Sequence, residues 1–399
     1  TNSGQITLNA ASGALLYNFS VTPPDAQNNL NSARLQLIGS GSDSASGEMT
    51  RVDTTAITAA PPTGDFAFAL ITAANQSPNV LHTGSAGRFT SSSAGAISAG
   101  LIDSNASPAL SSAALSGTLT APDASGRGTA TLAYGAQTST LAYYMTTAGK
   151  MYLMDIDATV ASPRSTGYMS AQVGNVVGGG FDNGALASGA SIMSLWGAAG
   201  TDEPISVLSL GRLSNGNAAA GTLDAVLDVS NHDSDAAGLA YTAQSYAVGT
   251  NGRGTLALTY AGATRQFVFY LDALEDGYLL EVGSPAGSTG LLEAQYAPTG
   301  GVYSDTLSGL FVGGTQFAQT PGPIVLIPGI GLSFGVLSAT YSSGLFAIDT
   351  TNGRGFGSLS QSGIASTPAV VYVVSPTKFE VLSFGTIQVD GSLLWMIQD

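Results

Sequence analysis

The stretch Gly252-Arg-Gly-Thr-Leu-Ala-Leu-Thr-Tyr260 decides the fold class. Leu256 and Leu258 alternate with small or polar residues, which is the two-residue period of a β-strand with one buried face. Asn251 and Gly252 stand before the strand, and this pair tolerates the positive φ that a tight hairpin turn requires. The stretch therefore predicts a strand that leaves a hairpin turn.

The same opening recurs along the chain. Self-comparison, which reveals repeat architectures, finds three copies: Gly126, Arg127 and Gly128; Gly252, Arg253 and Gly254; and Gly353, Arg354 and Gly355. An aromatic-rich strand, a short turn, a second strand and a last strand follow each copy, and the last strand ends in Gln172, Gln295 or Gln398. The arginine and the closing glutamine are 45, 42 and 44 positions apart (127 to 172, 253 to 295, 354 to 398). Such constant spacing indicates a duplicated β module.

The repeat divides the chain into units. We expect an N-terminal β-rich segment over 1–63, either a donor strand or a partial unit, then units at 64–172, 189–295 and a shorter, incomplete one at 309–398. Turn signals at intervals of roughly 8–12 residues predict about seven or eight strands in each full unit. The predicted fold is all-β, with tandem antiparallel meander barrels or sandwiches and little or no helix, because closure removes exposed sheet edges.

Composition excludes several classes of protein. The 399 residues carry a net charge of −15, with 26 acidic against 11 basic side chains, so nucleic acid and anionic lipid are poor partners. The absence of cysteine removes disulfides and thiolate chemistry. The uncharged stretch 306–348 contains Pro321, Pro323 and Pro328, so it predicts no continuous membrane helix. The first residues do not form a signal peptide, and we expect the mature form of an exported protein.

A resemblance follows from these residues. The run from Gly87-Arg-Phe-Thr90 through Gly100-Leu-Ile-Asp103 and Gly126-Arg-Gly-Thr-Ala-Thr-Leu132, with its two aromatic strands, resembles a repeat of secreted or cell-surface acidobacterial proteins that often accompanies bacterial Ig-like domains. The resemblance covers the first two units, the third only from Gly344 onward, and residues 1–63 hardly at all. It implies an extracellular or cell-surface location and no catalytic residues.

Two motifs suggest chemistry but lack the context that they need. Gly331-Leu-Ser-Phe-Gly335 matches a nucleophile elbow, which requires a following helix and a later histidine. A strand pattern follows instead, and His82 and His232 both lie upstream. Asp155 and Asp157 form a carboxylate pair, for which we expect a solvent-facing strand surface rather than acid–base catalysis.

The densest acidic cluster is a candidate calcium site. Its members are Asp228, Asn231, Asp233 and Asp235, near Asp224. The last three have the alternate spacing of ligands in a calcium loop, whereas the glycine and the glutamate of an EF-hand are replaced by Ala236 and Thr242. A looser calcium cage and a solvated hairpin tip both remain open, and no other cofactor is indicated.

The repeated arginines and the tryptophans have structural interpretations. An arginine fork can bind several turn carbonyls, so we expect Arg127, Arg253 and Arg354 to tie their own turns together. The flanking glycines predict positive φ or a close backbone approach. Trp196 and Trp395 lie in alternating strands, which favours core packing over a sugar-binding platform.

The sequence leaves several functions open and favours one. We expect a non-enzymatic extracellular structural protein, a subunit that self-associates into a surface filament, sheath or layer, with strand addition between subunits as one route. The alternative is a secreted adhesin or a ligand-binding β-barrel for glycan or a small apolar ligand. A secreted hydrolase and a transmembrane barrel are weaker readings, because no acid pair stands out and the strands are short and interrupted by glycine.

Overall fold

The computed structural model describes most of the chain. The described residues are 3–10, 13–21, 32–37, 46–76, 79–105, 110–157, 165–199, 205–231, 234–284, 287–304, 311–315, 347–359, 367–384 and 392–398. In these ranges the chain is strand and turn, with two short 3-10 helices, η1 (Thr54–Ala56) and η2 (Asn183–Leu186). The all-β prediction is confirmed. No helix in the described ranges is long and apolar enough to cross a membrane.

The first barrel is a closed antiparallel meander of eight strands. Its hairpins follow one another in sequence, and the last strand pairs with the first. The strands are β5 (Gly64–Gln76), β6 (Asn79–Ser91), β7 (Ala96–Ser104), β8 (Ser111–Leu119), β9 (Arg127–Tyr134), β10 (Gln137–Thr147), β11 (Lys150–Asp155) and β12 (Ser165–Ala171).

The second barrel repeats this closed topology. Its strands are β13 (Ser191–Ala199), β14 (Ile205–Asn217), β15 (Thr222–Asn231), β16 (Ser234–Val248), β17 (Arg253–Tyr260), β18 (Ala263–Ala273), β19 (Asp276–Val282) and β20 (Thr289–Ala294). Closure into barrels leaves no sheet edge in either unit.

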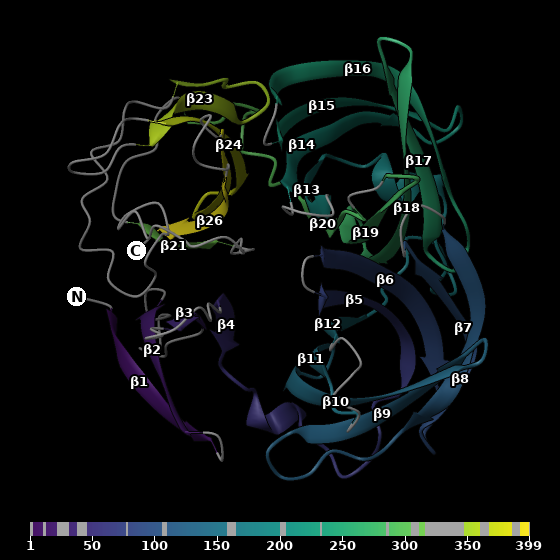
Figure 1. Cartoon of the computed structure of the whole chain (residues 1–399). Coiled ribbons are helices and arrows are strands. Elements are labelled where there is room, and N and C mark those ends of the chain that lie inside the picture. Colours follow the sequence, from purple (N-terminus) through teal and green to yellow (C-terminus); the bar gives the residue numbers. More distant parts are fainter. Residues whose placement is uncertain are drawn as a thin grey trace.

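Two open sheets complete the described structure. The N-terminal sheet has the order β1 (Ser3–Ala10), β2 (Gly13–Val21), β3 (Ser32–Leu37), β4 (Ser46–Thr50). The C-terminal sheet has the order β21 (Phe311–Thr315), β26 (Ser392–Gln398), β25 (Lys378–Ser383), β24 (Thr367–Ser375), β23 (Arg354–Leu359), β22 (Ala347–Ile348). Figure 1 shows the four sheets arranged around a common centre, with β21 against β2 and β3.

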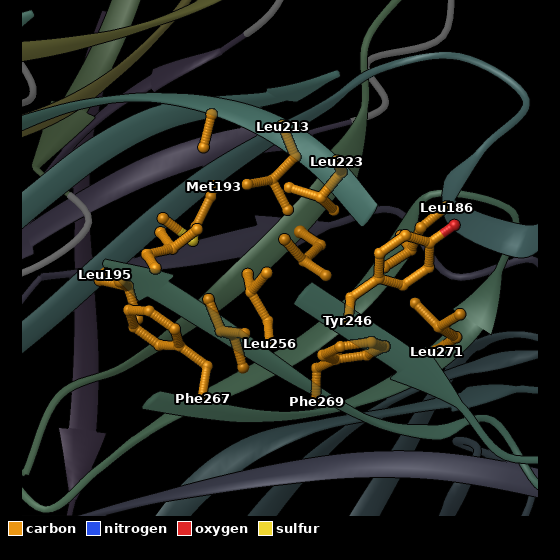
Figure 2. Close-up of a cluster of buried hydrophobic side chains, with 14 of the residues drawn as sticks. Leu186, Met193, Leu195, Leu213, Leu223, Tyr246, Leu256, Phe267, Phe269 and Leu271 are labelled. Carbon is orange, nitrogen blue, oxygen red and sulfur yellow. The ribbon is translucent and has the colours of Figure 1, made fainter. Parts of the chain in front are cut away.

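Apolar side chains fill both barrels. In the second barrel the buried cluster includes Met193, Leu195, Leu256, Phe267 and Phe269, which converge inside the barrel in Figure 2. Inward side chains from every strand meet there because the alternation of strand residues places one set of side chains inside. A second cluster of the same kind fills the first barrel. The interiors are therefore packed cores.

Candidate functional site at the joints between units

The Gly-Arg-Gly hairpins share one backbone geometry. The first glycine has a φ of +81° at Gly126, +79° at Gly252 and +73° at Gly353, a conformation that side chains other than glycine rarely adopt. In the first two hairpins the second glycine lets an aromatic ring lie on the backbone, whereas the side chains nearest to Gly355 are those of Ile348 and Val371. A Cβ on Gly254, for example, would lie 2.1 Å from the ring of Phe269. Both glycines therefore have the roles that the sequence predicts.

The arginine side chain of the second unit crosses to the first barrel. Arg253 Nε donates to Asp103 Oδ2 at 2.6 Å, and its Nη2 lies 3.3 Å from Oδ1. The Tyr270 hydroxyl donates to the same Oδ2 at 2.6 Å, and Ser112 Oγ donates to Oδ1. Asp103 comes from β7, whereas Arg253 and Tyr270 come from β17 and β18. One buried carboxylate thus joins two barrels.

The next joint has the same construction. Arg354 Nε and Nη2 donate to Asp228 Oδ2 and Oδ1 at 2.9 and 2.6 Å. The Tyr372 hydroxyl donates to Oδ2 at 2.6 Å, and the Gly238 amide donates to Oδ1 at 2.6 Å. Here Asp228 of the second barrel (β15) binds β23 and β24 of the C-terminal sheet. We call each Asp–Arg–Tyr set a clasp.

Each clasp is a desolvated charge pair with its hydrogen bonds satisfied. Asp103 and Asp228 are both 0% exposed. Burial, and then the hydrogen bond to Asp103, raises the pKa of the Tyr270 hydroxyl well above its ordinary range, so it stays a donor. The hydrogen bond to its aspartate is also the main cause that raises the pKa of each clasp arginine. A buried carboxylate is tolerated when a fork of donors surrounds it in this way.

A glutamine reinforces the first joint. Gln172, just after β12, donates through Nε2 to the carbonyls of Asn251 at 3.2 Å and Leu271 at 2.6 Å. Its Oε1 accepts from Arg88 Nε at 3.4 Å. The closing glutamine of one unit therefore binds the Gly-Arg-Gly turn of the next.

The second joint carries the same glutamine. Gln295 Nε2 donates to the carbonyls of Asn352 at 3.0 Å and Val373 at 2.8 Å. Arg212 Nε donates to Gln295 Oε1 at 2.6 Å. Arg88 and Arg212 stand at matched places in the two barrels, so the whole network recurs.

Apolar faces surround each clasp. At the first joint, Ala67, Ala69 and Ala86 of β5 and β6 pack against a larger apolar set on β18 and β19, namely Val268, Tyr270, Tyr278 and Leu280. Gly84 permits the closest approach, because a Cβ there would lie 1.6 Å from Thr289 Cγ2. At the second joint the packed residues are Ile192, Trp196, Leu208, Leu210, Val370, Tyr372, Val374, Leu382 and Phe384. Trp196 is therefore buried between units, whereas the Trp395 side chain lies outside the described residues.

The expectation for the arginines needs correction. Arg253 and Arg354 do not tie their own turns; they leave the turn and bind a carboxylate of the preceding unit. An aspartate is a stronger partner for a guanidinium than neutral carbonyls are. The turns are closed instead by Asn251 and Asn352, whose Oδ1 atoms accept from the following backbone amides. Arg127 differs from both and donates to the Tyr144 hydroxyl at 3.2 Å.

The clasp aspartates occupy equivalent positions in the repeat, and this spacing is visible in the sequence. Asp103 and Asp228 stand 24 and 25 positions before Arg127 and Arg253, in equivalent strands of the two barrels. Their partners, however, belong to the next unit, and the pattern within one unit does not reveal this.

The calcium candidate lies only partly within the described residues. Both oxygens of Asp228 accept hydrogen bonds from Arg354 in the second clasp. Asn231 and Asp235 lie at the β15–β16 turn, and Asp233 lies outside the described residues. In the described part of the chain, no three His, Cys, Asp or Glu side chains are placed to hold a metal ion.

The remaining candidates are placed as follows. Asp155 is buried, not solvent-facing, and its Oδ1 accepts from the Asp157 amide at 2.8 Å. Because β11 ends at Asp155, Asp157 leaves the strand, and its Oδ2 accepts from the Thr140 amide at 3.1 Å. The strand-face prediction for this pair was wrong. The Gly331–Gly335 motif, His232 and the His82 side chain lie outside the described residues.

A cavity near the common centre, whose mainly apolar lining also carries charged side chains, is a second candidate site. Its volume is about 750 Å³, and both lysines of the chain, Lys150 and Lys378, line it with Asp272, Asp276 and Glu293. Burial raises the pKa of Asp276 to about 6, and it also raises the pKa of Asp272. A carboxyl group of that pKa can exchange protons near neutral pH. No sequence pattern indicates this cluster, because its residues come from three different sheets.

Comparisons with known proteins add little to the site. No family model and no curated protein matches the sequence. Among solved structures, the intact Ap-TbpB, with N and C lobes, is aligned over 96% of this chain and 86% of that chain, at 10% identity and a TM-score of 0.21. A TM-score this low supports no statement about fold or function.

Proposed function

We propose that the chain is a non-enzymatic structural protein of the cell exterior, in which β-barrels are locked side by side into a stiff array. The observation that carries the proposal is the recurrence of the joint. Two successive contacts use the same Asp–Arg–Tyr clasp and the same closing glutamine. Because the contact recurs with the same buried charged groups, it sets a fixed angle between neighbouring units. An array needs such a fixed angle, whereas a single binding domain does not.

Assembly is the second part of the proposal. The array associates with further copies into a filament, sheath or layer, through the open edges of its terminal sheets. In the described residues, the edge strands are β1 and β4 in the N-terminal sheet and β21 and β22 in the C-terminal sheet. Unpaired strand edges are the places where another chain adds a strand.

The packed interiors favour this proposal over the ligand-binding alternative. An eight-stranded barrel that carries a ligand keeps space inside, whereas both barrels here are filled by side chains. Charged residues make up only 9% of the chain, which also suits lateral packing of weakly charged surfaces.

Electron microscopy and sedimentation over a concentration series test the proposal. We expect polymers of uniform width from the full chain. Asn9→Lys, on the edge strand β1, should reduce polymerisation, because a lysine on an edge opposes strand addition. Ala14→Lys is the matched control, since Ala14 is the exposed cross-strand partner of Asn9 on the inner strand β2. A chain that stays monomeric at every concentration contradicts the assembly.

A further inference from the structure

The N-terminal sheet reproduces the second half of a barrel. Its order, β1 to β4, follows that of β9 to β12. Gly4 lies opposite Phe19, as Gly128 lies opposite Tyr143. In both pairs the ring lies on the glycine, and a Cβ on Gly4 would be 2.8 Å from the Phe19 ring. Position 3 therefore corresponds to Arg127.

This sheet is seated on the first barrel as the first barrel is seated on the second. The hydroxyls of Thr50 and Tyr152 are hydrogen-bonded at 2.6 Å. At the first joint, Ser170 and Tyr278 form the same bond at 2.9 Å. The strand that supplies the hydroxyl is β4 in one case and β12 in the other, and these strands correspond.

The backbone contacts agree with this correspondence. The Asp53 amide donates to the Thr146 carbonyl at 2.8 Å, and the Val173 amide donates to the Asp272 carbonyl at 2.7 Å. Each bond joins the end of one unit to the aromatic strand of the next. The N-terminal sheet thus makes, on the first barrel, the contacts that β12 and the residues after it make on the second barrel.

The clasp part of that joint lacks its carboxylate. Arg127 and Tyr144 correspond to Arg253 and Tyr270, and they retain their mutual contact, with the guanidinium 6.0 Å from the ring centre. Tyr144 is 40% exposed, whereas Tyr270 is fully buried. Among the described residues, no Asp or Glu lies within ion-pair distance of Arg127.

The apolar face beside this pair is exposed too. Tyr152 and Tyr278 correspond, because they are the cross-strand partners of Tyr144 and Tyr270. Met154 and Leu280 each lie two residues further along the same strand, so they correspond as well. Leu280 is fully buried against the alanines of β5 and β6, while Met154 is 45% exposed. We call Arg127, Tyr144, Tyr152 and Met154 the receiving face.

The open edges of the N-terminal sheet are the two that a completed barrel would pair. In the first barrel, β12 pairs with β5, and β9 pairs with β8. The corresponding edges are β4 and β1. Leu8 and Met49 correspond to Leu132 and Met169 of the barrel core, yet both are exposed.

We propose that the receiving face and the two edges of the N-terminal sheet bind the first four strands of another unit of this repeat, with an aspartate at the position of Asp103. This proposal deepens the array proposal and rests on it in one respect, namely that units of this repeat are held together by the same joint. The partner would close the half-barrel, cover Tyr144 and Met154 and complete a third clasp.

A second copy of this chain can add a strand at an open edge of the N-terminal sheet, but it cannot complete the clasp at the receiving face. Asp103 and Asp228 are already engaged in clasps within each copy. The third unit has no acidic residue between positions 306 and 348, where its counterpart would stand. The partner is therefore defined by a free carboxylate at the position of Asp103; in this chain, the two described counterparts are already engaged and the third unit has no acidic residue there.

An extended chain tests the inference directly. Residues 64–126 are joined in front of Ser3, since position 3 corresponds to 127, so the added strands carry a copy of Asp103. Oxidation by hydrogen peroxide reports on the exposed methionines, with peptide mass spectrometry as the measurement. We expect oxidation of Met49 and Met154 to slow by about tenfold on extension, because the rate follows exposure. Residues 191–252, with Asp228, form a second extension in case the first does not fold.

The clasp has its own readout. In the extended chain, Arg127→Ala should lower Tm by several degrees. When the copy of Asp103 in the added strands is first changed to Ala, Arg127→Ala should no longer lower Tm. In the unextended chain Arg127→Ala should change Tm little. Three outcomes overturn the proposal: Met154 oxidises as fast in both extended chains as in the unextended chain; Arg127→Ala acts alike with and without the extension; or the unextended chain forms a dimer that protects Met154. Since none of these depends on polymer formation, failure of the filament proposal would be seen separately.

Discussion

At the scale of single residues, each clasp depends on one aspartate that three donors hold out of water. Removing the carboxylate from Asp103 leaves the Arg253 guanidinium and the Tyr270 hydroxyl without their partner at a barrel interface. Breaking such a pair is costly because a charge stays buried and uncompensated, whereas replacing the whole set by apolar groups is often neutral. The clasp therefore contributes to specificity between units even where it adds little net stability.

We expect Asp103→Ala to lower the free energy of unfolding by about 3–5 kcal/mol, the usual effect of breaking a buried ion pair. The triple change Asp103→Ala, Arg253→Leu and Tyr270→Phe should recover a large part of that loss. Denaturant titration followed by tyrosine and tryptophan fluorescence measures both. Asp235→Ala, at an exposed position, is the control and should stay within roughly 0.5 kcal/mol of the parent chain. Equal losses for the single and triple variants would contradict the account.

The buried carboxyl of Asp276 predicts a pH dependence. Burial is the main cause that raises its pKa to about 6, and Asp272 and Glu293 raise it further, while Lys150 lowers it and the Ala294 amide donates to Oδ1. In the unfolded chain the pKa is near its ordinary value, so the folded state binds more protons between pH 4 and 6. Stability from this group is thus present at low pH and falls as pH rises through about 6.

Asp276→Asn keeps an acceptor for Ala294 and removes the charge. We expect its Tm to exceed that of the parent chain at pH 8 and to approach it at pH 4.5, since the parent aspartate is then protonated. Thermal melts at both values measure the difference. An Asn variant whose Tm differs from the parent by the same amount at both pH values would show that Asp276 is not the titrating group.

At the scale of elements, the second glycine of the hairpin in each barrel lets a neighbouring strand and an aromatic ring approach the same backbone position. A Cβ on Gly254 would meet the Phe269 ring at 2.1 Å and the Ala247 carbonyl oxygen at 2.7 Å. The ring can turn, but the carbonyl belongs to a paired strand and cannot move far. The hairpin is therefore intolerant of even one methyl group.

Gly254→Ala should destabilise the chain by about 1–3 kcal/mol, as overpacking does in a well-packed core. Gly149→Ala is the matched control, because the nearest atom to its Cβ would be Ala171 Cβ at an ordinary 3.4 Å. Denaturant midpoints of both variants, with unchanged slopes, are the measurement. If the two variants are destabilised equally, the loss comes from glycine removal in general rather than from the ring contact.

Element by element, the sequence predicted strands better than it predicted partners. The alternation of Leu256 and Leu258 and the positive φ of Gly252 are local properties, so they could be inferred from neighbouring residues. The contact between Arg253 and Asp103 spans 150 positions and two units, and no local pattern encodes it. Asp155 is different: it has the strand phase of the buried Met151 and Leu153 on β11, so its burial follows from local alternation, and only the departure of Asp157 from the strand does not.

At the scale of the whole molecule, the joints couple barrels that would otherwise unfold one by one. In stacked repeats, stability is approximately the sum of the stability of each unit and of the contacts between neighbours. The first joint combines a buried clasp, a glutamine bridge and an apolar face with alanines on one side. Since these contacts exist only when both barrels are folded, they favour simultaneous folding of the two.

We expect calorimetry of the full chain to give a main transition in which both barrels unfold together. The double change Asp103→Ala and Gln172→Ala removes the clasp and the bridge of the first joint but leaves both barrel cores intact, so the main transition should split into two. The same pair of changes at exposed positions, Asp235→Ala with Gln137→Ala, should leave one transition. Asp228→Ala with Gln295→Ala should separate only the C-terminal sheet from the second barrel. A joint variant that shifts the whole transition to lower temperature without splitting it would mean that apolar contact alone couples the barrels, and the clasp would then set their orientation rather than their cooperativity.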